Sequence, residues 1–171
     1  MKTPLFQNVC EEQVFARLYR KWASDLHNFI YYKYGNAVNT EDKVQEAFIK
    51  LWDNCKETPV EKAKSFLFTV ANNLSLNEIK HQKVVLKYQQ VKPKSHTNES
   101  PEFLMEESQY MEKFQRALGK LSEAQRTAFL MNRVEGKRHK EIAELLGISR
   151  KAVEKRIYTA LEKLRQDLEE I

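Results

Sequence analysis

The chain has 171 residues, and its 29 Lys and Arg against 24 Asp and Glu leave a net charge of +5. This length suits one or two small domains, and no apolar run approaches the ~18 residues that span a bilayer, so we expect no membrane insertion. The N-terminal residues lack the apolar core of a secretory signal, which predicts a cytoplasmic protein. The two cysteines, Cys10 and Cys55, argue against a disulfide framework and offer no metal-ligand spacing.

Apolar residues recur at helical spacing along most of the chain. The pattern predicts helices at 10–34, 40–56, 60–89, 103–118, 122–135, 138–146 and 149–168. Residues 58–61 predict a capping box with Pro59 at the first helical position, and Ser122 with Gln125 predicts another. Residues 91–102 are polar and contain two prolines, which is typical of a linker. We therefore predict an all-α fold with two small helical domains, at 8–90 and 103–171, joined by a flexible linker at 91–102.

The helix expected at 40–56 has one apolar side and one mixed side. The apolar stripe, which we expect to face a core, contains Val44, Phe48, Leu51, Trp52 and Cys55. The opposite side contains Asp42, Gln45, Glu46, Ile49 and Asp53. Two interpretations stay open for that side: a solvated face, which the residues alone favour, and a docking surface for a basic protein partner.

The helix expected at 60–89 changes from apolar to amide-rich and then to basic. Its three asparagines are Asn72, Asn73 and Asn77. Asparagine is a poor residue for a helix interior, so these carboxamides either bond to backbone and water or contact the edges of bases. From residue 79 to residue 98 the chain has five lysines, Lys80 and Lys83 among them, and no acid, which favours contact with nucleic acid.

The last third of the chain has the pattern of a helix-turn-helix. A short helix at 140–146 is followed by Gly147, which suits the left-handed backbone of a helix end, and by Ser149, which suits a helix N-cap. In this motif the second helix enters the major groove of DNA with its first residues facing the bases. Those residues are Arg150, Lys151, Glu154 and Lys155. An ordinary αα-hairpin with a solvated charged face remains the alternative.

Several features argue against an enzyme. The four histidines are scattered, no glycine-rich phosphate loop is present, and neither cysteine has a catalytic context. We expect no catalytic residue, no cofactor and no metal. His139, which lies in a basic cluster at 137–140, is interpreted as a solvated side chain.

Three segments occur in a recognisable order: EDKVQEAFIKLW at 41–52, SFLFTVANNL at 65–74, and LSEAQRTAF at 121–129, the last followed by Glu135-Gly136 and Glu141-Ile142-Ala143. Together they resemble the sigma-70 family of bacterial RNA polymerase specificity factors, in particular its small two-domain extracytoplasmic-function group. The first segment resembles the helix that docks on core polymerase. The second, running on to Lys80, resembles the segment that opens and reads the −10 promoter element, and the third resembles the helix-turn-helix domain that reads the −35 element.

The resemblance implies a sigma factor that binds core RNA polymerase and directs promoter recognition, DNA melting and transcription initiation. Its implied partners are core RNA polymerase, through the large-subunit clamp helices and the flap, promoter DNA and an anti-sigma factor. The implied polymerase-binding residues are Asp42, Gln45, Glu46, Ile49 and Trp52. The implied −10 residues are Asn72, Asn73, Asn77, Lys80 and Lys83, with Asn73 at the pocket for a flipped base. The implied −35 residues are Arg150, Lys151, Glu154, Lys155 and Tyr158.

Two other functions stay open. One is a helix-turn-helix transcriptional regulator that does not act as a polymerase subunit, which a stable homodimer in solution would favour. The other is a sigma-mimicking adaptor, which would bind a partner without supporting transcription. The chain also departs from the family pattern: Ser122 replaces a usual proline, Phe66 a frequent tryptophan, and Asn77 and Lys80 the usual acid and arginine.

Overall fold

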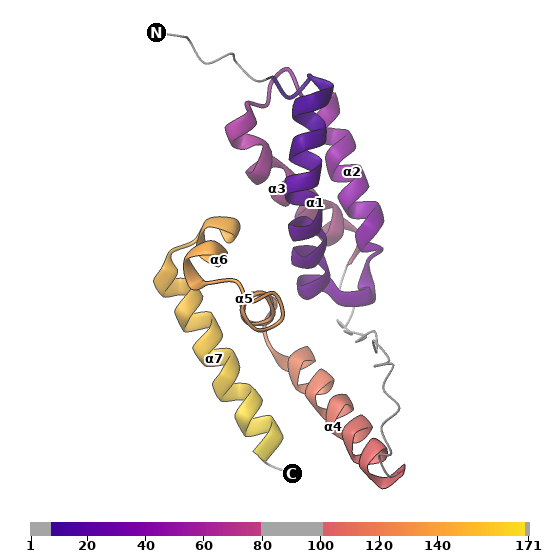
Figure 1. The fold of residues 1–171 in the computed structure, drawn as a ribbon, viewed down its shortest axis with the longest axis vertical. Coiled ribbons are helices and arrows are strands. Elements are labelled where there is room, and N and C mark those ends of the chain that lie inside the picture. Colours follow the sequence, from indigo (N-terminus) through magenta and orange to yellow (C-terminus); the bar gives the residue numbers. More distant parts are fainter. Residues whose placement is uncertain (1–7, 80–100, 170–171) are drawn as a thin grey trace. The chain divides into compact units, whose positions relative to one another are not determined.

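The computed structural model describes residues 8–79 and 101–169, and these residues form helices and no strand. The helices are α1 (Glu12–Tyr34), α2 (Thr40–Asp53), α3 (Ala63–Glu78), α4 (Pro101–Lys120), α5 (Glu123–Arg133), α6 (His139–Leu146) and α7 (Arg150–Glu169), with short 3-10 turns η1 (Gly35–Ala37) and η2 (Val60–Lys62). The chain divides into two compact units, residues 1–84 and 85–171 (Figure 1). The predicted all-α fold with two helical parts is therefore confirmed. The boundary predicted at residue 90 and residues 91–100 of the predicted linker lie outside the described residues. The last two residues of that linker, 101 and 102, belong to α4, which begins two residues earlier than predicted.

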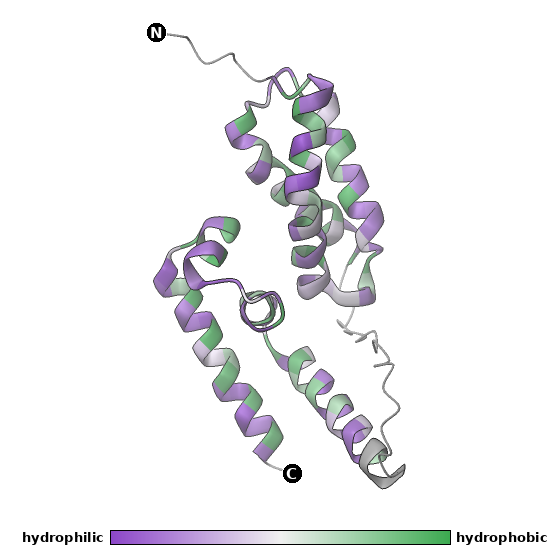
Figure 2. Ribbon diagram, in the orientation of Figure 1, coloured by the Kyte–Doolittle hydropathy of each residue, from purple (hydrophilic) through white to green (hydrophobic). Residues whose placement is uncertain are grey.

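The first unit is a bundle in which α1, α2 and α3 each pack against the other two (Figure 1). Each of these helices carries both hydrophobic and hydrophilic residues, so one side can be buried while the other meets water (Figure 2). The fully buried side chains include Leu26 and Ile30 of α1, Leu51 of α2 and Leu67 of α3. Burying one such side chain contributes about 1.5–3 kcal/mol. This packing fixes which sides of α2 and α3 are left exposed.

Cys10 and Cys55 form a disulfide, with their Cα atoms 5.1 Å apart, and this corrects the expectation from cysteine content. Cys10 precedes α1, and Cys55 follows α2. Because the short turn η1 joins the two helices, α1 and α2 run in opposite directions, and the start of α1 lies beside the end of α2 (Figure 1). The pairing depends on this tertiary arrangement, which the number and spacing of cysteines do not contain.

The third helix differs from its prediction at both ends. Residues 60–62 form the 3-10 turn η2 and α3 begins only at Ala63; it ends at Glu78, although the helix was expected to run to residue 89. The capping box predicted at 58–61 was wrong. Thr58 is buried, Pro59 has extended backbone, and no side chain caps η2. The N-cap position of η2 falls on Pro59, whose side chain has no acceptor atom, so the turn begins one residue later than the predicted box requires.

In the second unit, α7 packs against α4, α5 and α6 (Figure 1). The shared core includes Leu118 of α4, Met131 of α5, Ile142 of α6 and Val153 and Ala160 of α7, all of them almost fully buried. α7 is therefore anchored along one side by three other helices. Its opposite side is free to carry charge.

The start of α5 confirms the second predicted capping box. The Ser122 Oγ accepts a hydrogen bond from the Gln125 N–H at 3.2 Å, and the Gln125 side-chain oxygen accepts one from the Ser122 N–H at 3.3 Å. One residue further, the buried Arg126 donates to the Leu121 carbonyl oxygen at 3.1 Å. Burial lowers the pKa of this guanidinium from its ordinary value. Arg126 thus ties α5 to Leu121, the residue that directly follows α4, instead of facing a ligand.

Candidate nucleic-acid and protein interfaces

The mixed side of α2 is exposed. Asp42, Gln45, Ile49 and Trp52 are exposed and Glu46 is partly exposed; we call these five residues the α2 surface. Ile49 is 59% exposed and Trp52 is 44% exposed. Two large apolar side chains among two acids and one amide give this surface the composition of a protein-binding patch.

The buried side of α2 holds this surface in place. Val44, Phe48 and Leu51 are buried against the rest of the bundle. Phe15 of α1 packs edge-on against Phe48, with ring centroids 6.0 Å apart, and against Trp52, with centroids 5.1 Å apart. Trp52 was expected in the core stripe and also in the docking set. The structure packs one part of its ring on α1 and leaves the rest in solvent.

The three asparagines of α3 have different surroundings. Asn72 is partly buried, and its side-chain oxygen accepts hydrogen bonds from the Lys33 ammonium and the Tyr34 hydroxyl, both at 2.6 Å. Asn73 and Asn77 are exposed and lie one helical turn apart, so they share a side of the helix; we call them the α3 amides. Asn72 therefore joins α3 to α1, while the α3 amides present free surface to a ligand. Lys80 and Lys83 lie outside the described residues.

Lys33 was missed by sequence reasoning. Its ammonium bonds to Asn72 and lies over the rings of Phe29, at 5.5 Å from the centroid, and Tyr34, at 5.4 Å. It is the penultimate residue of α1 and is separated from Asn72 by 39 positions. No local pattern links two residues so far apart, so only the folded bundle identifies Lys33 as a cation next to the amide-rich helix.

The helix-turn-helix forms as predicted. Gly147 follows α6 with left-handed backbone angles, φ 67° and ψ 35°, and both its N–H and that of Ile148 bond to the Ala143 carbonyl oxygen. Glycine adopts this conformation without the steric cost that a Cβ imposes. Ser149 then caps α7, with its Oγ accepting a hydrogen bond from the Ala152 N–H at 3.1 Å. The turn and the cap together set where α7 begins.

The first turns of α7 present a mostly basic side to solvent. Arg150, Lys151, Lys155 and Tyr158 are exposed and Glu154 is partly exposed; we call these five residues the α7 surface. Glu154 accepts a hydrogen bond from the Arg150 Nε at 3.0 Å and lies 3.7 Å from the His139 Nδ1. An open groove of ≈ 560 Å³ runs along this surface, with Lys151, Glu154, Lys155 and Tyr158 among its lining residues. Cations beside an open groove on a helix-turn-helix are suited to the phosphates and base edges of DNA.

Arg138, His139 and Lys140 lie beside the α7 surface, in a groove that Arg150 also lines. His139 was interpreted as a solvated residue; it is partly exposed, and its Nδ1 lies 3.7 Å from a carboxylate oxygen of Glu154. A second open groove, of ≈ 370 Å³, is lined by Asn132, Arg138, His139, Lys140 and Arg150. The basic run at 137–140 was visible in the sequence. The position of this basic run beside α7 was not visible, because that position depends on how α6 packs.

The described residues hold no group of three or more His, Cys, Asp or Glu side chains arranged to bind a metal ion. Among the same residues, no helix has the length and apolar composition to cross a membrane.

Two family models match this chain. The model for Sigma-70 region 2 matches residues 18–84, and the model for Sigma-70, region 4 matches residues 111–164. The first span falls within the unit that carries the α2 surface, and the second within the unit that carries the α7 surface. Together they cover more than half of the 171 residues.

Solved structures are similar to this chain at low sequence identity. The sigma factor RpoE, crystallised in complex with the anti-sigma factor NepR from Bartonella quintana, aligns with a TM-score of 0.55 and 18% identity, over 91% of this chain and 96% of that chain. This likeness shows the fold. A chain of the RsbN–BldN complex aligns with a TM-score of 0.34 and 19% identity, over 91% of this chain and 92% of that chain. No curated protein matches the sequence significantly.

Proposed function

Because this chain belongs to the sigma-70 family, we propose that it binds core RNA polymerase and directs it to promoters as a two-domain extracytoplasmic-function sigma factor. The observation that carries the proposal is the chemistry of the two exposed surfaces. The α2 surface combines acids, an amide and apolar side chains, whereas the α7 surface is mainly cationic. A protein partner suits the first, and a DNA groove suits the second.

The α2 surface is the proposed docking site for the clamp helices of the large polymerase subunit. Ile49 and Trp52 provide apolar area that is already exposed, so little rearrangement is needed for a partner to cover it. Asp42 and Glu46 provide negative charge that favours approach of a basic partner. A few anchor residues of this kind carry most of the energy of a protein interface.

The α3 amides are the proposed contact with the −10 element. A carboxamide offers one acceptor and two donor hydrogens, which allows it to bond to the edge of an unpaired base. Taking a base out of the stack costs a few kcal/mol, so capture must compensate for unstacking. Asn73, which is exposed, is the proposed residue at the pocket for the flipped base, with Asn77, Lys80 and Lys83 following the strand; Asn72 supports them from its position against α1.

The α7 surface is the proposed contact with the −35 element. A good pairing between a side chain and a base edge contributes about 1–3 kcal/mol of discrimination, and cations on phosphates add affinity without sequence preference. Arg150, Lys151 and Lys155 are the residues that we expect to supply both kinds of contact, with Glu154 and Tyr158 completing the surface. His139, Arg138 and Lys140 extend the basic side toward the adjacent phosphates.

Neither unit alone is expected to hold promoter DNA tightly. When both units are held on polymerase, binding of one unit to DNA raises the effective concentration of DNA at the other unit. We therefore expect promoter selectivity from the assembled enzyme and not from the free chain. The free chain should bind duplex DNA weakly, mainly by charge and with a steep dependence on salt. We further propose that the protein acts in the cytoplasm. We also propose that an anti-sigma factor holds it inactive, because RpoE, which has a similar fold, was crystallised in complex with an anti-sigma factor.

One set of variants tests the proposal with three readouts on the full chain. Gln45→Ala should weaken affinity for core polymerase, Asn73→Ala should reduce permanganate reactivity of the −10 thymines in a promoter that the wild-type holoenzyme opens, and Lys155→Ala should change −35 preference. Lys50→Ala is the matched control, because Lys50 is exposed on α2 but lies outside the α2 surface. A wild-type chain that fails to bind core polymerase, or variants that leave all three readouts unchanged, would reject the proposal.

A further inference from the structure

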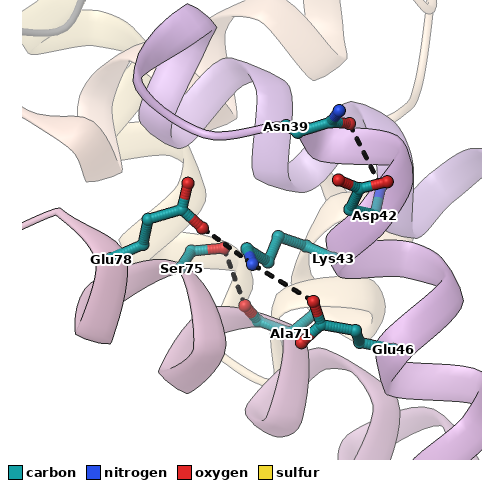
Figure 3. A network of polar contacts seen from close by, with 7 residues as sticks. All are labelled: Asn39, Asp42, Lys43, Glu46, Ala71, Ser75 and Glu78. Atoms are coloured by element: carbon teal, nitrogen blue, oxygen red, sulfur yellow. Dashed lines mark hydrogen bonds and ion pairs between the residues drawn. The ribbon is translucent and has the colours of Figure 1, made fainter.

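A lysine whose side chain is mostly covered by protein links α2 to the last turn of α3. The Lys43 side chain is 12% exposed, and its Nζ lies 2.7 Å from a carboxylate oxygen of Glu78 and 3.4 Å from one of Glu46 (Figure 3). The two carboxylates are far more open, with the Glu46 side chain 45% exposed and that of Glu78 46% exposed. One cation thus sits beneath two acids, each of which still reaches solvent.

The charge on Lys43 is stabilised by this arrangement. The hydrogen bond to Glu78 is the largest influence and raises the pKa of the ammonium; burial acts in the opposite direction, and Glu46 adds to the increase. The net result is a pKa above the ordinary lysine value of 10.5, so Lys43 stays charged at neutral pH. Without this cation the carboxylate of Glu78 would face the negative end of the α3 dipole uncompensated.

The two acids belong to different surfaces. Glu46 is part of the α2 surface. Glu78 is the last residue of α3 and directly follows Asn77, so it lies at the end of the turn that carries the α3 amides. Terminal helix turns open more easily than central ones, and a cross-helix ion pair opposes that opening. Figure 3 shows Lys43 and Glu46 projecting from α2 toward Glu78 on α3.

We propose that Lys43 is a positioning residue for both surfaces: it orients Glu46 for polymerase docking and, through Glu78, holds the last turn of α3 in the geometry that captures the −10 strand. This inference rests on the proposed function, because it assigns roles to the same two surfaces. Lys43 touches neither polymerase nor DNA in this account. It acts through its two carboxylate partners.

The proposal predicts that polymerase affinity and promoter opening respond differently to different variants. Removing the cation affects both surfaces, whereas removing the Glu78 charge affects only the end of α3. Lys43→Met keeps the length of the aliphatic stem and removes the charge, Glu78→Gln keeps the shape of the acid and removes its charge, and Lys43→Arg restores a cation. Lys50→Met, an exposed lysine changed in the same way on the same helix, is the control.

The experiment uses full-length protein with purified core polymerase and a promoter that the wild-type holoenzyme opens. We expect Lys43→Met to weaken polymerase affinity about fivefold, the size of the net contribution of one ordinary hydrogen bond, and to reduce permanganate reactivity of the −10 thymines at saturating polymerase. Glu78→Gln should reduce the permanganate signal with polymerase affinity unchanged. The double variant that combines Lys43→Met with Glu78→Gln should open the promoter no worse than Lys43→Met alone. Lys43→Arg should recover most of the polymerase affinity and of the permanganate signal. Lys50→Met should match wild type in both measurements.

Melting temperatures of the same variants separate positioning from simple stabilisation. If both signals fall in proportion to melting temperature in every variant, or if Glu78→Gln weakens polymerase affinity as much as Lys43→Met does, the positioning role is overturned. Failure of the proposed function looks different. In that case the wild-type chain itself would form no polymerase complex and open no promoter.

Discussion

The two units obtain their exposed surfaces in different ways. In the second unit, neighbouring residues place α7: Gly147 turns the chain and Ser149 caps the helix. In the first unit, contacts between distant residues hold the α2 surface and the α3 amides, including the packing of Phe15 on Trp52 and the Cys10–Cys55 disulfide. Local signals therefore set where α7 begins, although three other helices hold its length in place, whereas the α2 surface and the α3 amides depend entirely on contacts across the first bundle.

The largest effects are expected from cavities in the two cores, and these test whether the units are independent. Leu67 and Ile142 are both fully buried, one in each unit. Changing either to alanine should destabilise its own unit by about 2–5 kcal/mol. Hydrogen exchange read separately over residues 8–79 and 101–169 would show it. Loss of protection in both parts from a single change would contradict the division into units.

Reduction of the disulfide should have the next largest effect and should be confined to the first unit. Cross-linking two positions 45 residues apart restricts the unfolded chain, and losing that restriction costs about 2–4 kcal/mol. We expect a reductant, or the double change of Cys10 and Cys55 to serine, to lower the melting temperature of the first unit alone. The unchanged transition of the second unit serves as the internal control. Equal shifts in both transitions would argue that the disulfide does not act locally.

Removing local helix-end signals in the second unit should change the free energy of unfolding by a smaller amount. Ser122→Ala removes one half of the α5 capping box and should cost about 1 kcal/mol. Gly147→Ala meets no atom within 4 Å, so its cost, about 1 kcal/mol, comes from the left-handed backbone alone. Denaturant unfolding measures both.

Ser65→Ala is the matched control for the cap, because Ser65 is an exposed serine whose hydroxyl bonds to a carbonyl oxygen and caps no amide. Its effect should stay within about 0.5 kcal/mol. If Ser65→Ala destabilises the protein as much as Ser122→Ala does, the capping hydrogen bonds contribute no stability of their own.

The smallest effect concerns alkaline pH. The pKa of Lys43 is raised by folding, so the stability from its ion pairs is complete below the ordinary pKa of 10.5 and is lost as pH rises through the higher folded value. The difference in unfolding free energy between wild type and Lys43→Met, below about 1 kcal/mol, should therefore be constant from neutral pH to about pH 9 and shrink above 10.5. A difference that grows with pH would contradict the assignment.

The sequence was sufficient for the family and for much of the second unit. The order of three segments predicted a sigma-70 factor with two helical parts, and the two family models confirm it. The predicted ends of α6 and the start of α7 agree with the structure to within one residue, because a glycine, a serine cap and an apolar period mark them locally. The roles of the individual −35, −10 and polymerase residues stay predictions.

What the sequence did not contain are pairings between distant residues. The Cys10–Cys55 disulfide, the bond from Tyr34 to Asn72 and the Lys43–Glu78 pair each join elements that meet only in the folded bundle. The closeness of His139 to Glu154, at 3.7 Å, was likewise missed because the two residues lie on different helices. The Thr58 cap failed for a local reason: the turn begins one residue later than predicted, with Pro59 at its N-cap.

Transcription from a library of random promoters by purified core polymerase, with and without this protein, tests the central claim most directly. We expect transcripts that depend on the protein and that begin downstream of a shared pair of elements at −35 and −10. Absence of any protein-dependent transcript, together with no stable complex between the protein and core polymerase, would contradict the account.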